Sequence, residues 1–179
     1  MADNHDSYKR YTNMRDVCVG QRHSLMLPEE IAMRRANGDV STFYVCCSTL
    51  FPNCFTNSQP FESELLCVYG LAHDYDGMLR WAYNSWAENP QYDSRFGNWM
   101  SGDTYLVYPY NRSSMRFERL IDGIEVTEKI RALRAAGVDM SGVDAVLEKI
   151  RSLEITDYNL PWQQVVKEAQ AALDEASRK

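Results

Sequence analysis

The chain has 179 residues, of which 45% are hydrophobic and 12% aromatic, and its formal net charge is -6. These values fit one globular domain and exclude an intrinsically disordered chain. The negative charge argues against nucleic-acid binding, which needs Lys and Arg against phosphates, and no apolar run is long enough to span a bilayer.

Residues 1–15 are polar and irregular, and we expect them to form an arm without the basic and apolar regions of an export signal. The chain has an odd number of cysteines and no CxxC pair: Cys18, Cys46, Cys47, Cys54 and Cys67. This pattern predicts buried free thiols rather than a disulfide framework, and it disfavours a zinc site. We expect no metal and no other cofactor.

The first two thirds of the chain alternate apolar strands with short helices. The predicted strands are 16–21, 40–48 and 78–84, and the predicted helices between them are 28–38 and 60–75. Near-continuous apolar strands separated by helices are typical of parallel βαβ units with right-handed crossovers. The sequence therefore predicts an α/β fold with a parallel sheet.

A long loop and three helices are predicted to complete the chain. Residues 85–112 show little helical periodicity, and a loop of that length inside a compact domain is usually functional. The helices are expected at 113–137, 142–153 and 161–178, and the last two form a helical tail over 138–179. Ser113 or Ser114 is expected to cap the first of them, and Ser141 with Asp144 resembles a capping box for the second.

Aromatic and amide side chains gather where the third strand is predicted to end. Tyr83 and Asn84 close that strand, and Trp86 follows directly. In an α/β barrel the carboxyl ends of the strands face the site. Asn84 offers donors and an acceptor to a sugar hydroxyl or an acetamide, and Trp81 or Trp86 could form a wall against a sugar ring. We therefore predict a saccharide pocket here.

Other roles stay open for several of these residues. Trp81 and Tyr83 could instead fill the interior of a barrel, and Arg80 could form a structural ion pair rather than bind substrate. His23 follows the end of the first strand and could approach a ligand. His73 precedes the third strand, at the opposite end of the sheet from the predicted site, which favours a structural role.

The start of the helix predicted at 113–137 has a similar ambiguity. Arg112 and Arg116 flank Ser113-Ser114 in the sequence, and cationic and hydroxyl groups at a helix start could bind an anion. A plain helix cap is the other interpretation.

Two blocks of this sequence carry a family resemblance. They run from Gly77 to Trp86 (GMLRWAYNSW) and from Asp103 to Gly123 (DTYLVYP, RSSMRFERL and a following Gly), and FYVCC with Pro-Asn precedes them. They resemble the C-terminal part of glycoside hydrolase family 123, which is also the domain-of-unknown-function family numbered 4091. The likeness covers roughly residues 16–135 of this chain.

The resemblance implies a fold and an activity. It implies the last three or so parallel strands of a (β/α)8 catalytic barrel, with their helices, over residues 16–137. It also implies β-N-acetylgalactosaminidase-type hydrolysis of glycosphingolipid or related glycans. In that mechanism the acetamido oxygen of the substrate attacks the anomeric carbon, one carboxylate orients the acetamide, and its neighbour protonates the leaving oxygen.

The adjacent Asp-Glu pair that the family uses has no counterpart at a predicted strand end, since Asp174-Glu175 lies in the last helix. We therefore expect a C-terminal fragment of a glycoside hydrolase that contributes Arg80, Trp81, Tyr83, Asn84, Trp86 and His23 to substrate binding and no catalytic residue. The alternative is a non-catalytic half-barrel module for binding or assembly. A half-barrel leaves sheet edges open, so we expect a homo-oligomer or association with the N-terminal half of a barrel. The resemblance also implies an extracytoplasmic parent protein.

Overall fold

The computed structural model describes residues 13–21, 26–155, 157 and 159–178. At its centre is a three-stranded parallel sheet in the order β1-β2-β3, formed by Asp16–Gly20, Val40–Val45 and Gly77–Arg80. Val19 pairs with Phe43, and Phe43 pairs with Met78. Because paired residues in neighbouring strands point to the same side of a sheet, these three apolar side chains form one continuous row.

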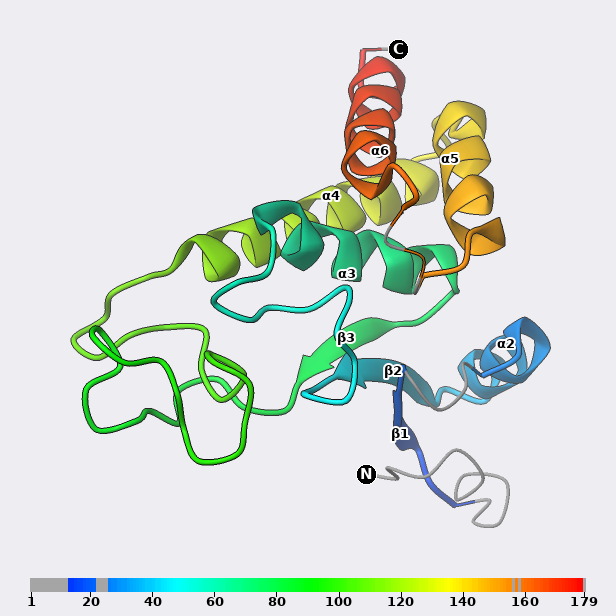
Figure 1. The fold of residues 1–179 in the computed structure, drawn as a ribbon. Coiled ribbons are helices and arrows are strands. Elements are labelled where there is room, and N and C mark those ends of the chain that lie inside the picture. Colours follow the sequence, from blue (N-terminus) through cyan, green and yellow to red (C-terminus); the bar gives the residue numbers. More distant parts are fainter. Residues whose placement is uncertain (1–12, 22–25, 156, 158, 179) are drawn as a thin grey trace.

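Five helices accompany the sheet in the described part of the chain. They are α2 (Pro28–Ala36), α3 (Pro60–Ala72), α4 (Met115–Ala135), α5 (Ser141–Ser152) and α6 (Trp162–Ala176). Figure 1 shows α3 and α4 side by side along one face of the sheet, with α5 and α6 stacked beyond them. None of the helices in the described ranges combines the length and the apolar character needed to cross a membrane.

Helix α3 connects the sheet to the rest of the core. Pro60 suits its first turn, and the Glu62 carboxylate accepts hydrogen bonds from the backbone N–H groups of Gln59 at 2.6 Å and Asn53 at 3.0 Å. Gly70 lets the helix approach β2 closely, because a Cβ atom there would lie 2.7 Å from Cε1 of Phe43. The buried face of α3 thus packs directly on the apolar row of the sheet.

The helices at the end of the chain belong to the same hydrophobic core. Buried side chains from Val17 in β1 to Ala176 in α6 form one cluster. Trp162 at the start of α6 is buried with its ring 6.2 Å from that of Phe51, and its indole N–H donates to the Asp157 carbonyl at 2.9 Å. The predicted helical tail is therefore packed into the domain.

The predicted α/β architecture with a parallel sheet is confirmed, and so are all the predicted helices. The described residues hold three strands, so a barrel stays a prediction. The second and third strands were predicted too long, since β2 ends at Val45 and not at Ser48, and β3 ends at Arg80 and not at Asn84. The backbone of 83–85 leaves the sheet and pairs with 104–106 instead, through Ser85 N to Thr104 O at 3.0 Å and Leu106 N to Tyr83 O at 2.8 Å.

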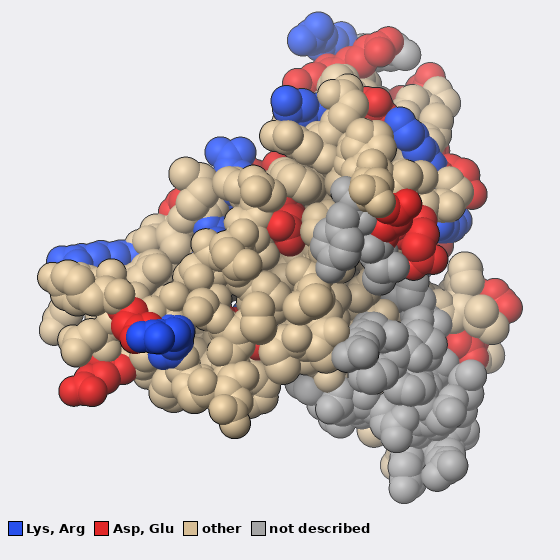
Figure 2. Space-filling model, viewed as in Figure 1, with Lys and Arg blue, Asp and Glu red and all other residues tan. Residues whose placement is uncertain are grey.

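Charged residues are unevenly placed on the face shown in Figure 2. Acidic and basic side chains gather over α5 and α6 and at the far end of the loop that follows β3. The surface between these two regions is largely uncharged.

Candidate functional site

The loop from Trp81 to Ser114 starts at the carboxyl end of β3 and extends away from α5 and α6 (Figure 1). The outgoing arm of this loop leaves β3 at Trp81, and its returning arm runs from Asp103 back to Ser114. The two arms are hydrogen-bonded to each other near β3, since Asn84 and Tyr105 form an antiparallel bridge and the Thr104 hydroxyl donates to the Ser85 carbonyl at 2.7 Å. Tyr105 and Leu106 are fully buried, which anchors the returning arm. The loop therefore has a defined conformation beside the end of the sheet.

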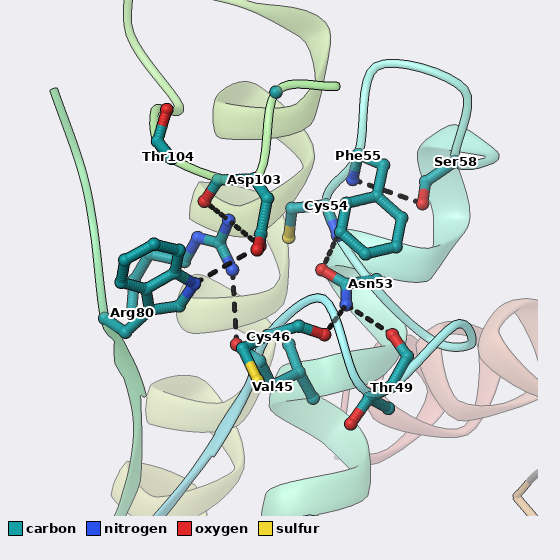
Figure 3. Close-up of polar contacts among 12 residues, drawn as sticks. Val45, Cys46, Thr49, Asn53, Cys54, Phe55, Ser58, Arg80, Asp103 and Thr104 are labelled. Atoms are coloured by element: carbon teal, nitrogen blue, oxygen red, sulfur yellow. Dashed lines mark hydrogen bonds and ion pairs between the residues drawn. The ribbon is translucent and has the colours of Figure 1, made fainter. Parts of the chain in front are cut away.

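A buried carboxylate lies beneath this loop. Asp103 is fully buried, and its Oδ1 atom accepts from Arg80 Nη2 at 2.9 Å and from Trp81 Nε1 at 3.2 Å. Arg80 also donates to the Asp103 and Val45 carbonyls, as Figure 3 shows. The Arg80 side chain is only 6% exposed. The carboxylate thus joins the end of β3 to the returning arm of the loop.

A second buried arginine lies close by. Arg116, in the first turn of α4, donates to the Cys54 carbonyl at 2.6 Å and to the Gly102 carbonyl at 2.7 Å, and burial lowers the pKa of its guanidinium. Gly102 has a φ of 77°, and a Cβ atom there would collide with the Arg116 guanidinium. Within the described residues, Asp103 Oδ2, Arg80 Nε and Arg116 Nη2 have no hydrogen-bond partner.

The carboxyl end of β2 is also held by polar contacts. The Asn53 side-chain amide donates to the Cys46 carbonyl at 3.0 Å and the Thr49 carbonyl at 2.6 Å, so the turn after β2 is fixed (Figure 3). Desolvation raises the pKa of the Cys47 thiol, and the nearby Cys46 and Asp103 raise it further. A thiol that stays protonated is a poor nucleophile, so Cys47 is not activated for attack.

Tyr83, Asn84 and Trp86 share a pocket of about 340 Å³. The remaining lining residues come from the returning arm and the start of α4: Val107, Tyr108, Tyr110, Asn111, Arg112, Ser113 and Phe117. Trp86 is 39% exposed, and its indole N–H donates to the Val107 carbonyl at 2.8 Å. Half-exposed aromatic rings beside two amide side chains can stack on a sugar ring and hydrogen-bond its hydroxyls.

The structure brings together three of the six predicted site residues. Tyr83, Asn84 and Trp86 line this pocket, whereas Arg80 and Trp81 belong to the Asp103 cluster. His23 lies outside the described residues. Among the residues that the structure describes, none from β1, β2 or the turn after β2 lines the pocket. The carboxyl ends of β1 and β2 therefore do not contribute to it.

Several residues of the site were not singled out from the sequence. Asp103, Tyr108 and Tyr110 lie about 20 or more residues after β3, and only the folding of the loop brings them back to the site. Arg112 was considered for an anion site at the helix start, and the structure places it in the lining of the pocket. The signal that could have found them is the density of aromatic and polar residues in the long loop. Trp99 is a further example, because its half-exposed ring lies 4.8 Å from that of Trp81.

The contacts of His73 support the structural role expected for it. It ends α3 at the opposite end of the sheet from the pocket, with its ring 4.4 Å from that of Tyr69. Burial, with a smaller effect of Arg151, lowers the pKa of His73 to about 4. No group of three or more His, Cys, Asp or Glu residues in the described part of the chain is arranged to hold a metal ion.

Comparisons with known proteins connect this fold to an enzyme family. The model of the catalytic domain of glycoside hydrolase 123 matches residues 1–133. A solved family 123 glycoside hydrolase from Clostridium perfringens, studied for glycolipid glycan hydrolysis, shares the fold with a TM-score of 0.82 at 21% identity. The match covers 99% of this chain and 35% of that chain, so this chain spans about a third of its relative. No curated protein matched. The family match extends over most of the sequence, and the chain therefore belongs to glycoside hydrolase family 123.

Proposed function

We propose that this chain supplies part of the substrate-binding cleft of a glycoside hydrolase that acts on N-acetylgalactosaminyl glycans. The observation that carries the proposal is the pocket of Tyr83, Asn84 and Trp86, which lies beyond the carboxyl end of β3 in a chain of family 123. The solved relative from Clostridium perfringens was studied for the hydrolysis of glycolipid glycans. Binding sites in α/β folds gather at the carboxyl ends of the strands, and this pocket lies beyond the end of β3, while no described residue of β1 or β2 lines it.

The lining of the pocket suits a neutral sugar ring. Tyr83 and Trp86 are exposed enough to present ring faces, with 45% and 39% of their surface accessible. The Trp86 indole is fixed by its bond to Val107, so stacking on it loses little side-chain freedom. Asn84 supplies a carbonyl oxygen and an amide N–H₂ group, which match the two ends of an acetamido substituent.

The carboxylate pair needed for substrate-assisted hydrolysis is, in this proposal, not among the residues of this sequence. The adjacent pair Asp174-Glu175 spans the end of α6 and lies away from the end of the sheet. Asp103 is fully buried and engaged by Arg80 and Trp81, so it is not presented to a ligand. The chain would thus bind and orient substrate without supplying the acid.

The topology of the sheet favours a second candidate, a non-catalytic module for binding or assembly. Among the described residues, β1 and β3 each pair with β2 alone, which leaves one edge of each outer strand without a strand partner. Such edges can pair with further strands, from another part of a barrel or from a second copy. Failure of the chain to bind glycans would leave this candidate as the one supported.

Titration with methyl β-N-acetylgalactosaminide, followed by calorimetry or NMR, tests the leading proposal. We expect Asn84→Ala and Trp86→Ala each to weaken binding about tenfold, equivalent to roughly 1.4 kcal/mol. Tyr92→Ala is the matched control, because Tyr92 is 92% exposed on the same loop and does not line the pocket. We also expect no release of a chromophore from the corresponding aryl glycoside. The proposal would be contradicted if wild type and the three variants bound the sugar equally, or if this chain rapidly hydrolysed the aryl glycoside.

A further inference from the structure

Arg112 is the charged residue among those that line the pocket of Tyr83, Asn84 and Trp86. Its side chain is exposed and makes no hydrogen bond or ion pair with any residue that the structure describes. A guanidinium group at the wall of an aromatic pocket, without a carboxylate partner, is available to a ligand.

The other polar groups at the start of α4 are already engaged. Ser114 is the helix cap, since its hydroxyl accepts from Phe117 N at 3.2 Å and donates to the Leu106 carbonyl. Ser113 donates to the Glu118 carboxylate. Arg116 is buried among the carbonyls of Cys54 and Gly102. Of the two arginines that flank the serines in the sequence, Arg112 alone faces the pocket.

The backbone around Arg112 is held by a tight turn. The Tyr108 N–H donates to the Arg112 carbonyl at 2.8 Å, and the turn between them includes Tyr110 and Asn111 at φ values of 63° and 56°. Two successive residues other than glycine in the left-handed region cost free energy, and such strain is retained most often where a loop serves a ligand. The turn thus fixes the point from which the Arg112 side chain extends.

The charges around the pocket favour an anion on balance. No Asp or Glu lines it. The Glu118 carboxylate opposes an anion, but it accepts the hydrogen bond from Ser113. The buried Arg116 cation lies 5.3 Å from the centre of the Tyr105 ring, and that ring lies 5.3 Å from the ring of Tyr108, which lines the pocket. Arg116 thus adds a second positive charge behind the tyrosine rings at this side of the pocket.

We propose that Arg112 makes this pocket select glycans that carry an anionic group, a carboxylate or a sulfate, over their neutral counterparts. This inference rests on the proposed glycan-binding function and adds a substrate class to it. The planar guanidinium can donate two parallel hydrogen bonds to the two oxygens of a carboxylate or sulfate while the sugar ring stacks on Trp86. Such charge-assisted pairs are roughly twice as strong as neutral hydrogen bonds.

The test uses three monosaccharides and the whole chain at low and high salt. The probes are N-acetylgalactosamine, its 6-sulfate ester, and N-acetylneuraminic acid, which carries a carboxylate. We expect one or both anionic sugars to bind about tenfold more tightly than the neutral one at low salt, and the difference to shrink at high salt. The two anionic arms distinguish a sulfated from a sialylated ligand.

Variants locate the effect. Arg112→Gln should remove the preference, so that the anionic sugar and N-acetylgalactosamine bind this variant with similar affinities, while Arg112→Lys should keep part of the preference. Arg95→Gln is the control, since Arg95 is an exposed arginine of the same loop outside the pocket.

Equal binding of all three sugars by the wild-type chain overturns this inference and leaves the glycan-binding proposal standing. A preference that survives in Arg112→Gln, or inorganic sulfate that binds as tightly as the sulfated sugar, also overturns it. No binding of any sugar overturns both.

Discussion

Asp103 shows how a single buried side chain organises the loop beside the site. Its Oδ1 atom accepts from both Arg80 and Trp81, which are the last residue of β3 and the first residue of the loop. The guanidinium neutralises the buried carboxylate, and the indole N–H satisfies a further lone pair. Trp81 and Arg80 are thereby fixed in place relative to the returning arm of the loop.

Removal of this carboxylate should be costly. Asp103→Ala leaves the Arg80 guanidinium buried without its anion, and we expect the free energy of unfolding to fall by about 3–5 kcal/mol. Urea denaturation followed by tryptophan fluorescence measures this change. Asp93→Ala is the control, because Asp93 forms a comparable pair with Arg95 at the surface, and we expect almost no change in the urea midpoint. Similar midpoints for the two variants would refute the structural role of Asp103.

His73 gives the protein a dependence of stability on pH. Its pKa is about 4 in the folded protein and about 6.5 when unperturbed, because burial and Arg151 disfavour the charged ring. Between these values the unfolded chain binds a proton that the folded chain does not, so folding becomes weaker as the pH falls from 6.5 to 4. Above pH 6.5 both states are neutral at this residue, and its contribution is constant.

The difference between wild type and His73→Gln isolates this effect. We expect wild type to lose about 1–2 kcal/mol more than the variant between pH 7 and pH 4.5, once solvent screening at this half-buried residue is allowed for. Parallel unfolding curves as a function of pH provide the measurement. The comparison is needed because Glu62 and Glu64 change the slope in the opposite direction, since burial raises the pKa of both carboxyls. Identical pH profiles for the two proteins would contradict the prediction.

At the scale of the elements, α3 and α4 touch through a glycine. A Cβ atom on Gly123 would lie 2.9 Å from the Glu64 carbonyl oxygen and 3.0 Å from Cβ of Cys67. The obstacle on the Glu64 side is helix backbone, which cannot move as a flexible side chain would. The absence of a side chain at this position therefore sets the distance between the two helices.

Gly123→Ala should push α4 away from α3. We expect a loss of about 1–3 kcal/mol in the free energy of unfolding, typical of overpacking in a core. Gly142→Ala is the matched control, since Gly142 lies in α5 with no atom within 4 Å of an added Cβ, and the helix propensity of alanine should leave stability unchanged or slightly higher. Thermal or urea unfolding of both variants checks the prediction, which fails if Gly123→Ala is as stable as Gly142→Ala.

Helix ends show which local signals were sufficient. Ser114 was one of two serines expected to cap α4, and it does so through its bond from Phe117 N. The capping box predicted at Ser141 and Asp144 is wrong, because α5 begins at Ser141 with Met140 as its cap. The Asp139 carboxylate accepts from Ser141 N at 3.0 Å, a contact that the spacing of Ser141 and Asp144 does not reveal.

At the scale of the whole molecule, the hydrophobic core and the long loop that carries the pocket form two separate regions. Helices α3 to α6 share one core, which also includes the inward face of the sheet, and the long loop lies at the other end (Figure 1). The buried arginines Arg80 and Arg116 connect the loop to β3 and α4 through their bonds to Asp103 and Gly102. Association through the edges of β1 and β3 stays a prediction, as does the extracytoplasmic location expected for the parent protein.

The sequence by itself determined the parallel α/β core, the helices and the family, because apolar periodicity and local motifs are short-range properties of the chain. It also placed Tyr83 and Asn84 at the end of the third strand and Trp86 directly after it, whereas in the structure β3 ends at Arg80 and all three residues lie in the loop. Only the tertiary structure decided that Arg80 turns to Asp103 and that Tyr108 and Arg112 come back to complete the pocket. The reason is physical, since these positions depend on backbone pairing and buried charges between residues 20 or more positions apart, and no local pattern encodes such contacts.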